Sequence, residues 1–464
     1  MVNLKTVKTI HFIGIKGVAM AGLSVICKQR GMAVSGSDVA LKFITDDTLH
    51  REGITVLESF DPAHLDGQPD LVVVGTSWGT DNVEVAEAKR RGIPIISDAE
   101  LRGLLSREKK TIAVTGVHGK TTATALLAHL FTRAGLQPSF LVGTGTVPNL
   151  GSNARWAAGD YFIVEGDEYS RSHDDPTPKF LDLQPAISII TSIEWEHVDI
   201  FPDTQAIEAA FKKLVGVTSD LVVACGDWPS VRKVISGQEQ KVATYGLTER
   251  NLWQAHDIRQ EPDRMVFRVK REGIDIDEFS TNILGRHNVL NALACIIVSL
   301  KAGIELETIR DGLQTFSGTQ RRFEVTESKG ITFVDDYGHH PSEIKATLET
   351  VRRRYPDRRI VCVFQPHMAS RTKALLADFA KSFSDVDIVL LMDIFDSARE
   401  HAVDITSKDL ADAVRQTHPN AAYSGSVEQT VAALRSQLKP DDVVVTMGAG
   451  NVYQVRDKLI QNNQ

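Results

Sequence analysis

Cysteine is scarce in this sequence, and its few cysteines lie far apart. Only four occur among the 464 residues, at positions 27, 225, 295 and 362, mostly within apolar stretches. Disulfide frameworks and zinc sites usually show closely spaced cysteines, so neither is expected here. The four are predicted to be buried thiols in a reducing compartment, which favours the cytoplasm.

Long apolar runs and an excess of basic residues are also absent. No apolar stretch approaches the ~20 residues that a membrane-spanning helix needs. The N-terminal run MVNLKTVKTIHFIGIKG leads straight into a glycine turn and is predicted to be a first strand, not a signal peptide. The formal net charge of −8 gives no indication of a nucleic acid or an anionic membrane as a partner. Sequence repeats and low-complexity segments are absent too.

The composition is that of a globular protein, with 42% hydrophobic and 24% charged residues. At roughly 150 residues per domain, the length suggests about three domains. Predicted strands alternate with predicted helices, which is typical of an α/β fold. Residues 241–283 differ, since their alternating strands predict an antiparallel appendage.

The stretch IAVTGVHGKTT, residues 112–122, contains the clearest chemical motif. A run rich in β-branched residues predicts a buried strand, and TTATALLAHLFTRAG then predicts a helix. Between them, Gly116 and Gly119 allow a turn whose amides, with the helix N-terminus, can face an anion. Lys120 can reach the outer phosphates of a nucleotide, and the Thr121 hydroxyl can bind Mg²⁺. Val114 stands where the common phosphate-loop pattern has its first glycine.

Acidic side chains follow two further apolar stretches. DYFIVE, residues 160–165, predicts a strand that ends in Glu165, with Asp167 and Glu168 just beyond it. A second strand, predicted over 186–193, is followed by Glu194, Glu196, His197 and Asp199. An acid at such a strand end beside a phosphate loop commonly holds Mg²⁺, directly or through water. We therefore expect a magnesium site at this edge of the sheet.

The segment GRHNVLNALA, residues 285–294, predicts the start of another helix. His287, Asn288 and Asn291 are polar in its first turns, while its other positions are mostly apolar. A helix cap would explain Asn288. Capping does not explain Asn291, which lies inside the predicted helix.

The first domain carries a second glycine turn. A predicted strand ends in GIKGVAMAG, where Gly14 and Gly17 frame a tight turn into a helix, although Gly-x-x-Gly replaces the usual dinucleotide fingerprint. Ser37 and Asp38 follow the next strand, and Asp38 lies about 20 residues past the turn, where an acid can bond a ribose hydroxyl. These features predict a Rossmann-like, nucleotide-binding domain. Its strands are expected at residues 9–14, 32–35, 71–75 and 93–96.

The third domain, which begins near Gly318, contains a dense polar cluster. A predicted strand ends in DDYGHHPSE, with Asp336 at the strand end and His339 and His340 after it. Adjacent histidines rarely bind one metal ion on regular structure, so hydrogen-bonding or positioning roles are favoured. The strands expected here span residues 331–334, 359–364, 388–392 and 443–447. With the helices between them, they predict a second, smaller Rossmann-like sheet.

Together, these motifs resemble those of the Mur ligase family, the ATP-dependent amide-forming enzymes of peptidoglycan assembly. The resemblance spans nearly the whole chain, and the motifs stand in family order: GIKGVAMAG, GVHGKTT, GRHNVLNAL, RRF, DDYGHHPSE, FQPH and GAG. It implies an N-terminal Rossmann-like domain that binds a UDP-sugar, residues 1–107. A central phosphate-loop ATPase-like domain, 108–317, would bind ATP, and a C-terminal Rossmann-like domain, 318–464, would bind the amine.

The resemblance also implies roles for individual residues. Those expected to contact ATP are Gly116, His118, Gly119, Lys120, Thr121, Thr122, His287, Asn291, Arg322 and Asp336. Those expected to bind the UDP-sugar are Gly14, Lys16, Gly17, Ser37, Asp38 and Ser77. Those expected to hold Mg²⁺ are Thr121, Glu165 and His197. Those expected to serve catalysis are Lys120, His197, His340 and Arg371, with either His197 or His340 as the base that deprotonates the amine.

Three interpretations of function follow. The third-domain motifs resemble members that join L-alanine to UDP-N-acetylmuramate through an acyl phosphate, and this is the first interpretation, although Met368 stands where an arginine is usual. YSRSHDDPTPKF and EWEHVDIFPD in the central domain resemble members that attach the tripeptide L-Ala-γ-D-Glu-meso-diaminopimelate, which is the second. The third, a catalytically silent nucleotide-binding scaffold, is disfavoured by the intact Gly-Lys-Thr-Thr.

Two smaller expectations complete the prediction. Lys212 follows His197 at the spacing of the carbamoylated lysine of later Mur ligases, but a solvated charge on a helix is the simpler interpretation. The protein is expected to be a cytoplasmic monomer or weak dimer, without a nucleic-acid or membrane partner.

Overall fold

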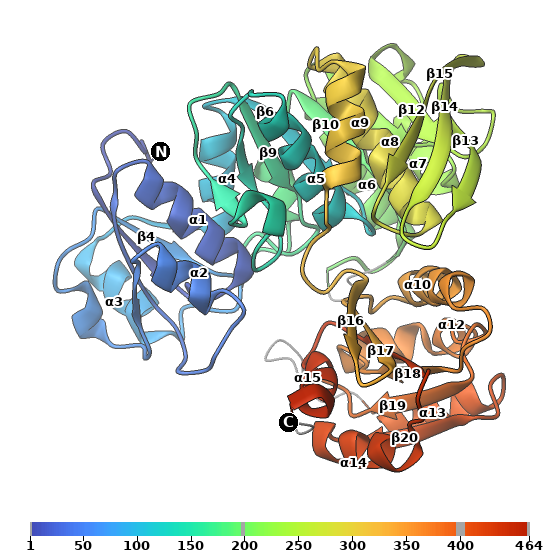
Figure 1. Cartoon of the computed structure of the whole chain (residues 1–464). Helices are drawn as coiled ribbons and strands as arrows, with labels where there is room; N and C mark the ends of the chain where they lie inside the picture. Colours follow the sequence, from blue (N-terminus) through green and yellow to red (C-terminus); the bar gives the residue numbers. More distant parts are fainter. Residues whose placement is uncertain (1, 196–199, 396–403, 462–464) are drawn as a thin grey trace. The chain divides into compact units, whose positions relative to one another are not determined.

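The computed structural model describes residues 2–195, 200–395 and 404–461. It contains three β-sheets with their associated helices, which Figure 1 shows in chain order. This architecture confirms the predicted α/β class. The chain divides into two compact units: residues 1–257, 267–282 and 288–320 form the first, and residues 258–266, 283–287 and 321–464 form the second.

The first sheet has five parallel strands in the order β3-β2-β1-β4-β5. Its strands are β1 (Thr9–Ile13), β2 (Ala33–Ser37), β3 (Thr55–Leu57), β4 (Leu71–Val74) and β5 (Ile95–Ser97). Its helices are α1 (Val18–Gln29), α2 (Asp46–Arg51), α3 (Val83–Arg91) and α4 (Asp98–Ser106). Because β2 and β4 flank β1, the strand order reverses at the carboxyl end of β1, where open α/β sheets bind ligands.

The second sheet has ten strands in the order β15-β14-β13-β12-β11-β10-β6-β9-β7-β8. Its strands are β6 (Lys110–Thr115), β7 (Ser139–Leu141), β8 (Ala154–Arg155), β9 (Tyr161–Glu165), β10 (Ile187–Ile190), β11 (Leu221–Cys225), β12 (Val242–Gly246), β13 (Trp253–Gln260), β14 (Met265–Arg271) and β15 (Ile274–Thr281). Its helices are α5 (Lys120–Arg133), α6 (Thr204–Val217), α7 (Pro229–Ile235), α8 (Arg286–Lys301) and α9 (Leu306–Thr315).

The central strands of this sheet are apolar and buried because helices cover a parallel sheet on both faces. The prediction of an antiparallel appendage over residues 241–283 was wrong at its start. Strand β12 pairs parallel with β11, and β13 pairs parallel with β12, so the same sheet simply continues.

The third sheet has six strands in the order β16-β17-β21-β18-β19-β20, and only the β16–β17 pair is antiparallel. Its strands are β16 (Glu324–Ser328), β17 (Ile331–Asp336), β18 (Ile360–Phe364), β19 (Ile388–Met392), β20 (Ala421–Gly425) and β21 (Val443–Met447). Its helices are α10 (Pro341–Arg354), α11 (Ala369–Ala374), α12 (Leu376–Phe379), α13 (Ser407–Arg415), α14 (Val427–Gln437) and α15 (Tyr453–Gln461). Edge strands β16 and β20 were not predicted because neither carries an apolar run.

All four cysteines are buried and free of disulfides, as predicted. Among the residues that the structure describes, no helix is both long and apolar enough to cross a membrane.

Candidate functional site

The turn between β6 and α5 requires glycine at two positions. Gly116 has φ +114° and Gly119 has φ +80°, angles that other residues rarely adopt. A Cβ on Gly116 would lie 2.3 Å from Thr191 Oγ1, and one on Gly119 would lie 2.3 Å from Asn291 Oδ1. Helix α5 begins at Lys120, directly after Gly119, so its N-terminus faces the turn. The strand, turn and helix of the predicted phosphate loop are thus present.

Lys120 is held over this loop by a buried carboxylate. Its Nζ donates to Gly116 O at 2.7 Å and to Glu168 Oε2 at 2.8 Å. Glu168 is fully buried and also accepts the Gly116 N–H at 3.2 Å. Burial raises the pKa of Glu168 to about 7, although the ammonium of Lys120 opposes the rise. The sequence placed Glu168 in an acidic cluster but could not identify it as the partner of Lys120.

Thr121 and Glu165 form the part of the site suited to a magnesium ion. Thr121 Oγ1 donates to Glu165 Oε1 at 2.8 Å, and the Gly143 N–H donates to Glu165 Oε2 at 2.7 Å. Burial raises the pKa of Glu165, the charge of Asp167 adds to the rise, and Lys120 opposes it. Mg²⁺ prefers hard oxygen ligands and few protein groups. A hydroxyl and a carboxylate already in contact beside a phosphate loop fit this ion.

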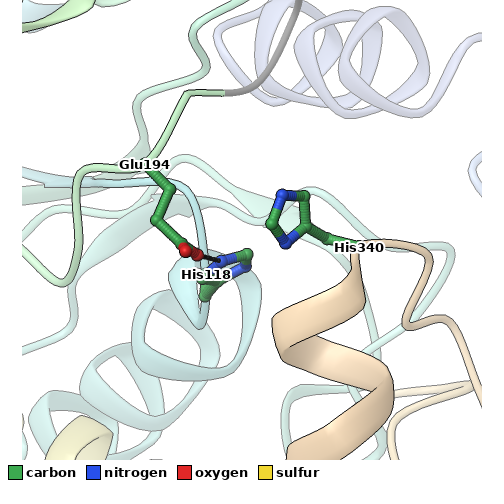
Figure 2. A group of neighbouring side chains, drawn as sticks. All are labelled: His118, Glu194 and His340. Carbon is green, nitrogen blue, oxygen red and sulfur yellow. Dashed lines mark hydrogen bonds and ion pairs between the residues drawn. The ribbon is translucent and has the colours of Figure 1, made fainter. Parts of the chain in front are cut away.

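A histidine of the loop pairs with an acid at the end of the neighbouring strand β10. His118 Nε2 hydrogen-bonds to the carboxylate of Glu194, which follows β10, and Figure 2 shows this contact. The His118 N–H donates to Ser192 Oγ at 2.9 Å, which ties the loop to the same strand end. His197, a predicted metal ligand and base candidate, lies outside the described residues, as do Glu196 and Asp199.

Asn291 has a packing role inside α8. It is buried, its Nδ2 donates to Asn288 Oδ1 at 3.0 Å, and its amide lies against Gly119. This contact explains why a polar residue occupies a helix interior that capping could not account for. Thr122 is buried in the first turn of α5, and His287 is the second residue of α8. Lys212 is exposed on α6, as the interpretation of a solvated charge requires.

The first-domain turn is also built on glycine. Gly14 has φ +84°, and both its N–H and that of Ile15 donate to Ser37 O, at 2.9 and 3.2 Å. Gly17 precedes the first residue of α1. Asp38 is buried and accepts the Lys16 N–H at 2.7 Å and the Val39 N–H at 2.8 Å, and burial raises its pKa. The turn and the predicted ribose-binding acid are therefore adjacent.

Two predicted sugar-binding side chains in this domain form hydrogen bonds within the fold. Lys16 is 2% exposed, and its Nζ donates to Val39 O, to Leu41 O and to Glu58 Oε1 at 3.2, 2.9 and 2.8 Å. Ser37 is fully buried and donates its hydroxyl to the Glu84 carboxylate. Because the Lys16 ammonium and the Ser37 hydroxyl already donate to groups of the protein, no observed contact supports their assignment to the sugar nucleotide, which stays a prediction.

Trp78 is a candidate binding residue of the first-domain turn that sequence analysis did not identify. It lies in the loop after β4, beside the exposed Ser77, and a Cβ on Gly14 would lie 2.6 Å from Trp78 Nε1. Its ring packs against Phe60 with the ring centroids 4.4 Å apart. A lone tryptophan in the segment GTSWG carries no periodic signal. Only the adjacency of β1 and β4 brings it to the glycine turn.

In the second unit, Asp336 ends β17 and is buried. Its two oxygens accept the N–H groups of Phe323 and Gly338 at 2.9 and 2.8 Å. Burial raises the pKa of Asp336 to about 6, and the guanidinium of Arg322 opposes the rise. Arg322 also lies over the Tyr337 ring, 5.3 Å from its centroid. Arg322 and Asp336 are therefore neighbours, and their shared contact with ATP stays a prediction.

His340 caps α10, and Figure 2 shows it at the start of that helix. Its Nδ1 accepts the Ser342 N–H at 3.3 Å, and Glu343 accepts the His340 backbone N–H at 3.3 Å. An accepting Nδ1 favours the tautomer with the proton on Nε2. That tautomer suits hydrogen-bond donation better than proton abstraction, in line with a positioning role.

The predicted amine-binding segment follows β18. Met368 has φ +71° and precedes α11, in which Arg371 is 3% exposed and donates from Nη1 to His367 O at 3.5 Å. The His367 ring stacks on Phe395 with an interplanar angle of 13°. Strand β18 is a neighbour of β21, which in turn pairs with β17. This segment and Asp336 therefore share one edge of the sheet.

Comparison with known proteins covers the whole chain. Residues 9–110 match the model described as Mur ligase family, catalytic domain; residues 114–299 match the Mur ligase middle domain; and residues 321–450 match the Mur ligase, glutamate ligase domain. The UDP-N-acetylmuramate–L-alanine ligase of Caldanaerobacter subterraneus subsp. tengcongensis is 39% identical over 468 residues, covering 100% of this chain and 99% of that protein.

Two solved structures are also similar. The UDP-N-acetylmuramate–alanine ligase of Thermotoga maritima is 25% identical with a TM-score of 0.82, over 98% of this chain and 99% of that one. The UDP-N-acetylmuramate:L-alanyl-γ-D-glutamyl-meso-diaminopimelate ligase of Neisseria meningitides is 31% identical with a TM-score of 0.62, over 68% of this chain and 100% of that one. With all three domains matched in order and a relative 39% identical along its full length, the chain belongs to the Mur ligase family.

Proposed function

We propose that this protein is an ATP-dependent ligase that joins L-alanine to UDP-N-acetylmuramate in the synthesis of peptidoglycan precursors. The observation that carries this proposal is the loop at Gly116–Gly119, with Lys120 on the buried Glu168 and Thr121 on the buried Glu165. Full-length similarity to alanine-adding ligases supports the choice of reaction. Because ATP and the sugar nucleotide are intracellular metabolites, we place the reaction in the cytoplasm.

The chemistry needs such a loop. A carboxylate is a poor acyl donor, so the sugar carboxylate first attacks the γ-phosphorus of ATP, which gives an acyl phosphate and ADP. The amine nitrogen then attacks the acyl carbon, a proton leaves the amine, and phosphate departs. Joining two anions in the first step requires neutralisation, which Lys120 and the α5 N-terminus supply. Thr121 and Glu165 would hold Mg²⁺, which supplies further positive charge at the transferred phosphoryl group.

The third domain is proposed to select the amine. Arg371 is suited to the carboxylate of an amino acid because its planar fork can bond both oxygens. With Met368 in place of a second arginine, Arg371 would carry more of that recognition. Arg322 and Asp336 are assigned to ATP, and His340 to hydrogen-bond donation. His197 then stands as the candidate base.

The tripeptide is the second candidate amine, favoured by a specific observation. The Neisseria meningitides ligase for that tripeptide is 31% identical over the 68% of this chain that it matches. The alanine-adding relative is 39% identical over 100% of this chain, which places alanine first.

A competition assay tests the proposal. The purified protein is given UDP-N-acetylmuramate, ATP and Mg²⁺ with equimolar L-alanine and tripeptide, and product masses and phosphate release are measured. We expect the alanyl product in clear excess. An excess of tripeptide product would establish the second candidate instead. Absence of phosphate release with any amine, in a protein that binds ATP, would favour the silent scaffold.

A further inference from the structure

Four charged residues form a network beside the end of β9, next to the proposed nucleotide site. None of them has been assigned a role so far. Asp98 and Arg102 lie on α4, Asp167 follows β9, and Lys179 begins the short helix Lys179–Asp182. The side chains of Asp98, Arg102 and Lys179 are 1%, 3% and 8% exposed. Burying so many charges is costly unless each is paired, so their arrangement needs an explanation.

The two cations share Asp98 but differ in what else they contact. Lys179 Nζ donates to both oxygens of Asp98, at 2.9 and 2.8 Å. Arg102 donates to Asp98 Oδ2 from Nη2 at 2.6 Å and to Asp167 Oδ2 from Nη1 at 2.9 Å. The same Nη1 lies 3.4 Å from Glu165 O. Arg102 therefore bridges α4 to the end of β9, whereas the side chain of Lys179, among the described residues, hydrogen-bonds to Asp98 alone.

The end of β9 carries three acidic residues, and Lys120 bonds to one of them. Glu165, Asp167 and Glu168 stand within four residues. Lys120 bonds to Glu168, and Arg102 bonds to Asp167. Without Arg102, the Asp167 carboxylate, whose side chain is 20% exposed, would lose the cation that hydrogen-bonds to it beside the loop that must receive a polyphosphate. Burial would raise the pKa of Asp98, but Lys179 and Arg102 outweigh it and lower that pKa, so Asp98 stays ionised and holds both cations.

We propose that Arg102 is a positioning residue of the nucleotide site, delivered by the last helix of the first domain. It orients Glu165 through the backbone carbonyl and compensates Asp167 through the side chain. Its fork geometry is what allows one side chain to hold Asp98 and Asp167 together. Helix α4 falls within residues 9–110, the stretch that matches the first family model, so the first domain contributes to the site of the second. This inference rests on the proposed function, since the bound nucleotide is taken to be ATP.

The test compares two variants that each remove one buried cation from Asp98. In Arg102→Met, Asp98 keeps Lys179 but Asp167 loses its partner. In Lys179→Met, Asp98 keeps Arg102, and Asp167 keeps its hydrogen bond to Arg102. Binding of a fluorescent, slowly hydrolysed ATP analogue with Mg²⁺ is titrated for both full-length variants, and thermal unfolding is measured in parallel. A purely structural network predicts similar losses in both variants and in both measurements.

We expect both variants to unfold at lower temperature, but only Arg102→Met to bind the analogue about tenfold more weakly, the loss typical of one charged hydrogen bond. Adding Asp167→Asn to Arg102→Met should recover most of the affinity, because no uncompensated charge is left. If Arg102→Met does not fold, Arg102→Lys replaces it, and the lost bridge should still weaken binding.

Equal analogue affinities in Arg102→Met and Lys179→Met would overturn the inference while leaving the proposed function intact. Failure of Asp167→Asn to restore binding would overturn the charge-compensation part. If the unmodified protein does not bind the analogue at all, the proposed function itself fails. The three results are therefore distinguishable.

Discussion

The protein contains two strand–glycine–helix turns that look alike in sequence but are equipped differently. GIKG follows β1 and GVHGK follows β6, and each segment contains one lysine. In the first turn, the Lys16 side chain donates to Val39 O, Leu41 O and Glu58. Asp38 accepts the backbone N–H of Lys16. In the second, Lys120 lies on the loop itself, against Gly116 O and a buried glutamate.

The difference follows the chemistry that each turn is proposed to perform. A pyrophosphate that is only bound can be held by backbone N–H groups and a helix N-terminus. A phosphoryl group in transfer develops charge, which needs a mobile cation and oxygen ligands for a metal ion. The first turn should therefore tolerate loss of its lysine in catalysis, and the second should not.

The largest expected effect is that of Lys120→Ala. Removing the cation that meets charge on the transferred phosphoryl group should raise the barrier by at least ~3 kcal/mol, a fall in kcat of about a hundredfold or more. Phosphate release under saturating substrates measures it. Near-normal kcat in a folded variant would remove the proposed distinction between the two turns.

Lys120→Ala also leaves Glu168 buried without its cation, so a stability loss could be mistaken for a catalytic one. The double variant Lys120→Ala with Glu168→Gln removes both charges and serves as the control. We expect its unfolding temperature to recover while its kcat stays low.

The next effect is a pH dependence specific to the second turn. The pKa of Glu168 is raised from 4.5 to about 7, so between these values the folded protein holds a proton that the unfolded chain has released. Its contribution to stability is therefore present at acid pH and lost as pH rises from about 4.5 to about 7, by about 3 kcal/mol. Unfolding of the wild type and of Glu168→Gln is compared across this range.

Glu168→Gln cannot titrate at this position. The free energy of unfolding of the wild type minus that of the variant should therefore decline as pH rises and become constant above pH 7. A difference that is independent of pH would mean that the Lys120 contact keeps Glu168 ionised throughout.

Lys16→Met should affect stability and spare the chemical step. It removes charged hydrogen bonds to two carbonyls of the loop after β2, a loss of roughly 1.5–3 kcal/mol. Chemical denaturation measures this loss, and kcat at saturating sugar nucleotide should stay within about threefold of the wild type. A fall in kcat comparable with that of Lys120→Ala would contradict the structural role of Lys16.

The smallest effect on folding is expected for Gly17→Ala. Gly17 has φ −58°, and the nearest atom to a Cβ there would be Gly14 O at 3.5 Å, so alanine should change stability by no more than ~0.5 kcal/mol. The KM for the sugar nucleotide should nevertheless rise, because a pyrophosphate over the α1 N-terminus needs close approach to the backbone. An unchanged KM would argue against a pyrophosphate at this turn.

Gly119→Ala is the matched variant in the second turn. With φ +80° and Asn291 Oδ1 at 2.3 Å from its Cβ, it should destabilise the fold by at least about 1–2 kcal/mol. Equal stabilities of the two alanine variants would show that the glycines are not distinguished by the turns they occupy.

Local sequence was sufficient for most of the buried parallel strands and for both turns, although the apolar run of β11 was not recognised as a strand. Apolar runs identified β1, β6, β9, β10 and β21, because a buried parallel strand has few residue types to choose from. Edge strands β16 and β20 were missed because half-exposed strands lack this signal. The sequence also named Glu165 and Glu168 as strand-end acids. Their positions, at the end of β9 and three residues beyond it, did not show which of them contacts Lys120.

What the sequence by itself determined is the chemistry carried by neighbours: two glycines, a lysine and a threonine at fixed spacing between a strand and a helix. What only the tertiary structure decided is which distant group each side chain contacts. Lys120 meets Glu168 across 48 positions, Lys16 meets Glu58 across 42, and Arg102 meets Asp167 across 65. Turn geometry depends on local backbone sterics, whereas these pairs depend on which strands lie side by side, and strand order is a property of the packed sheet.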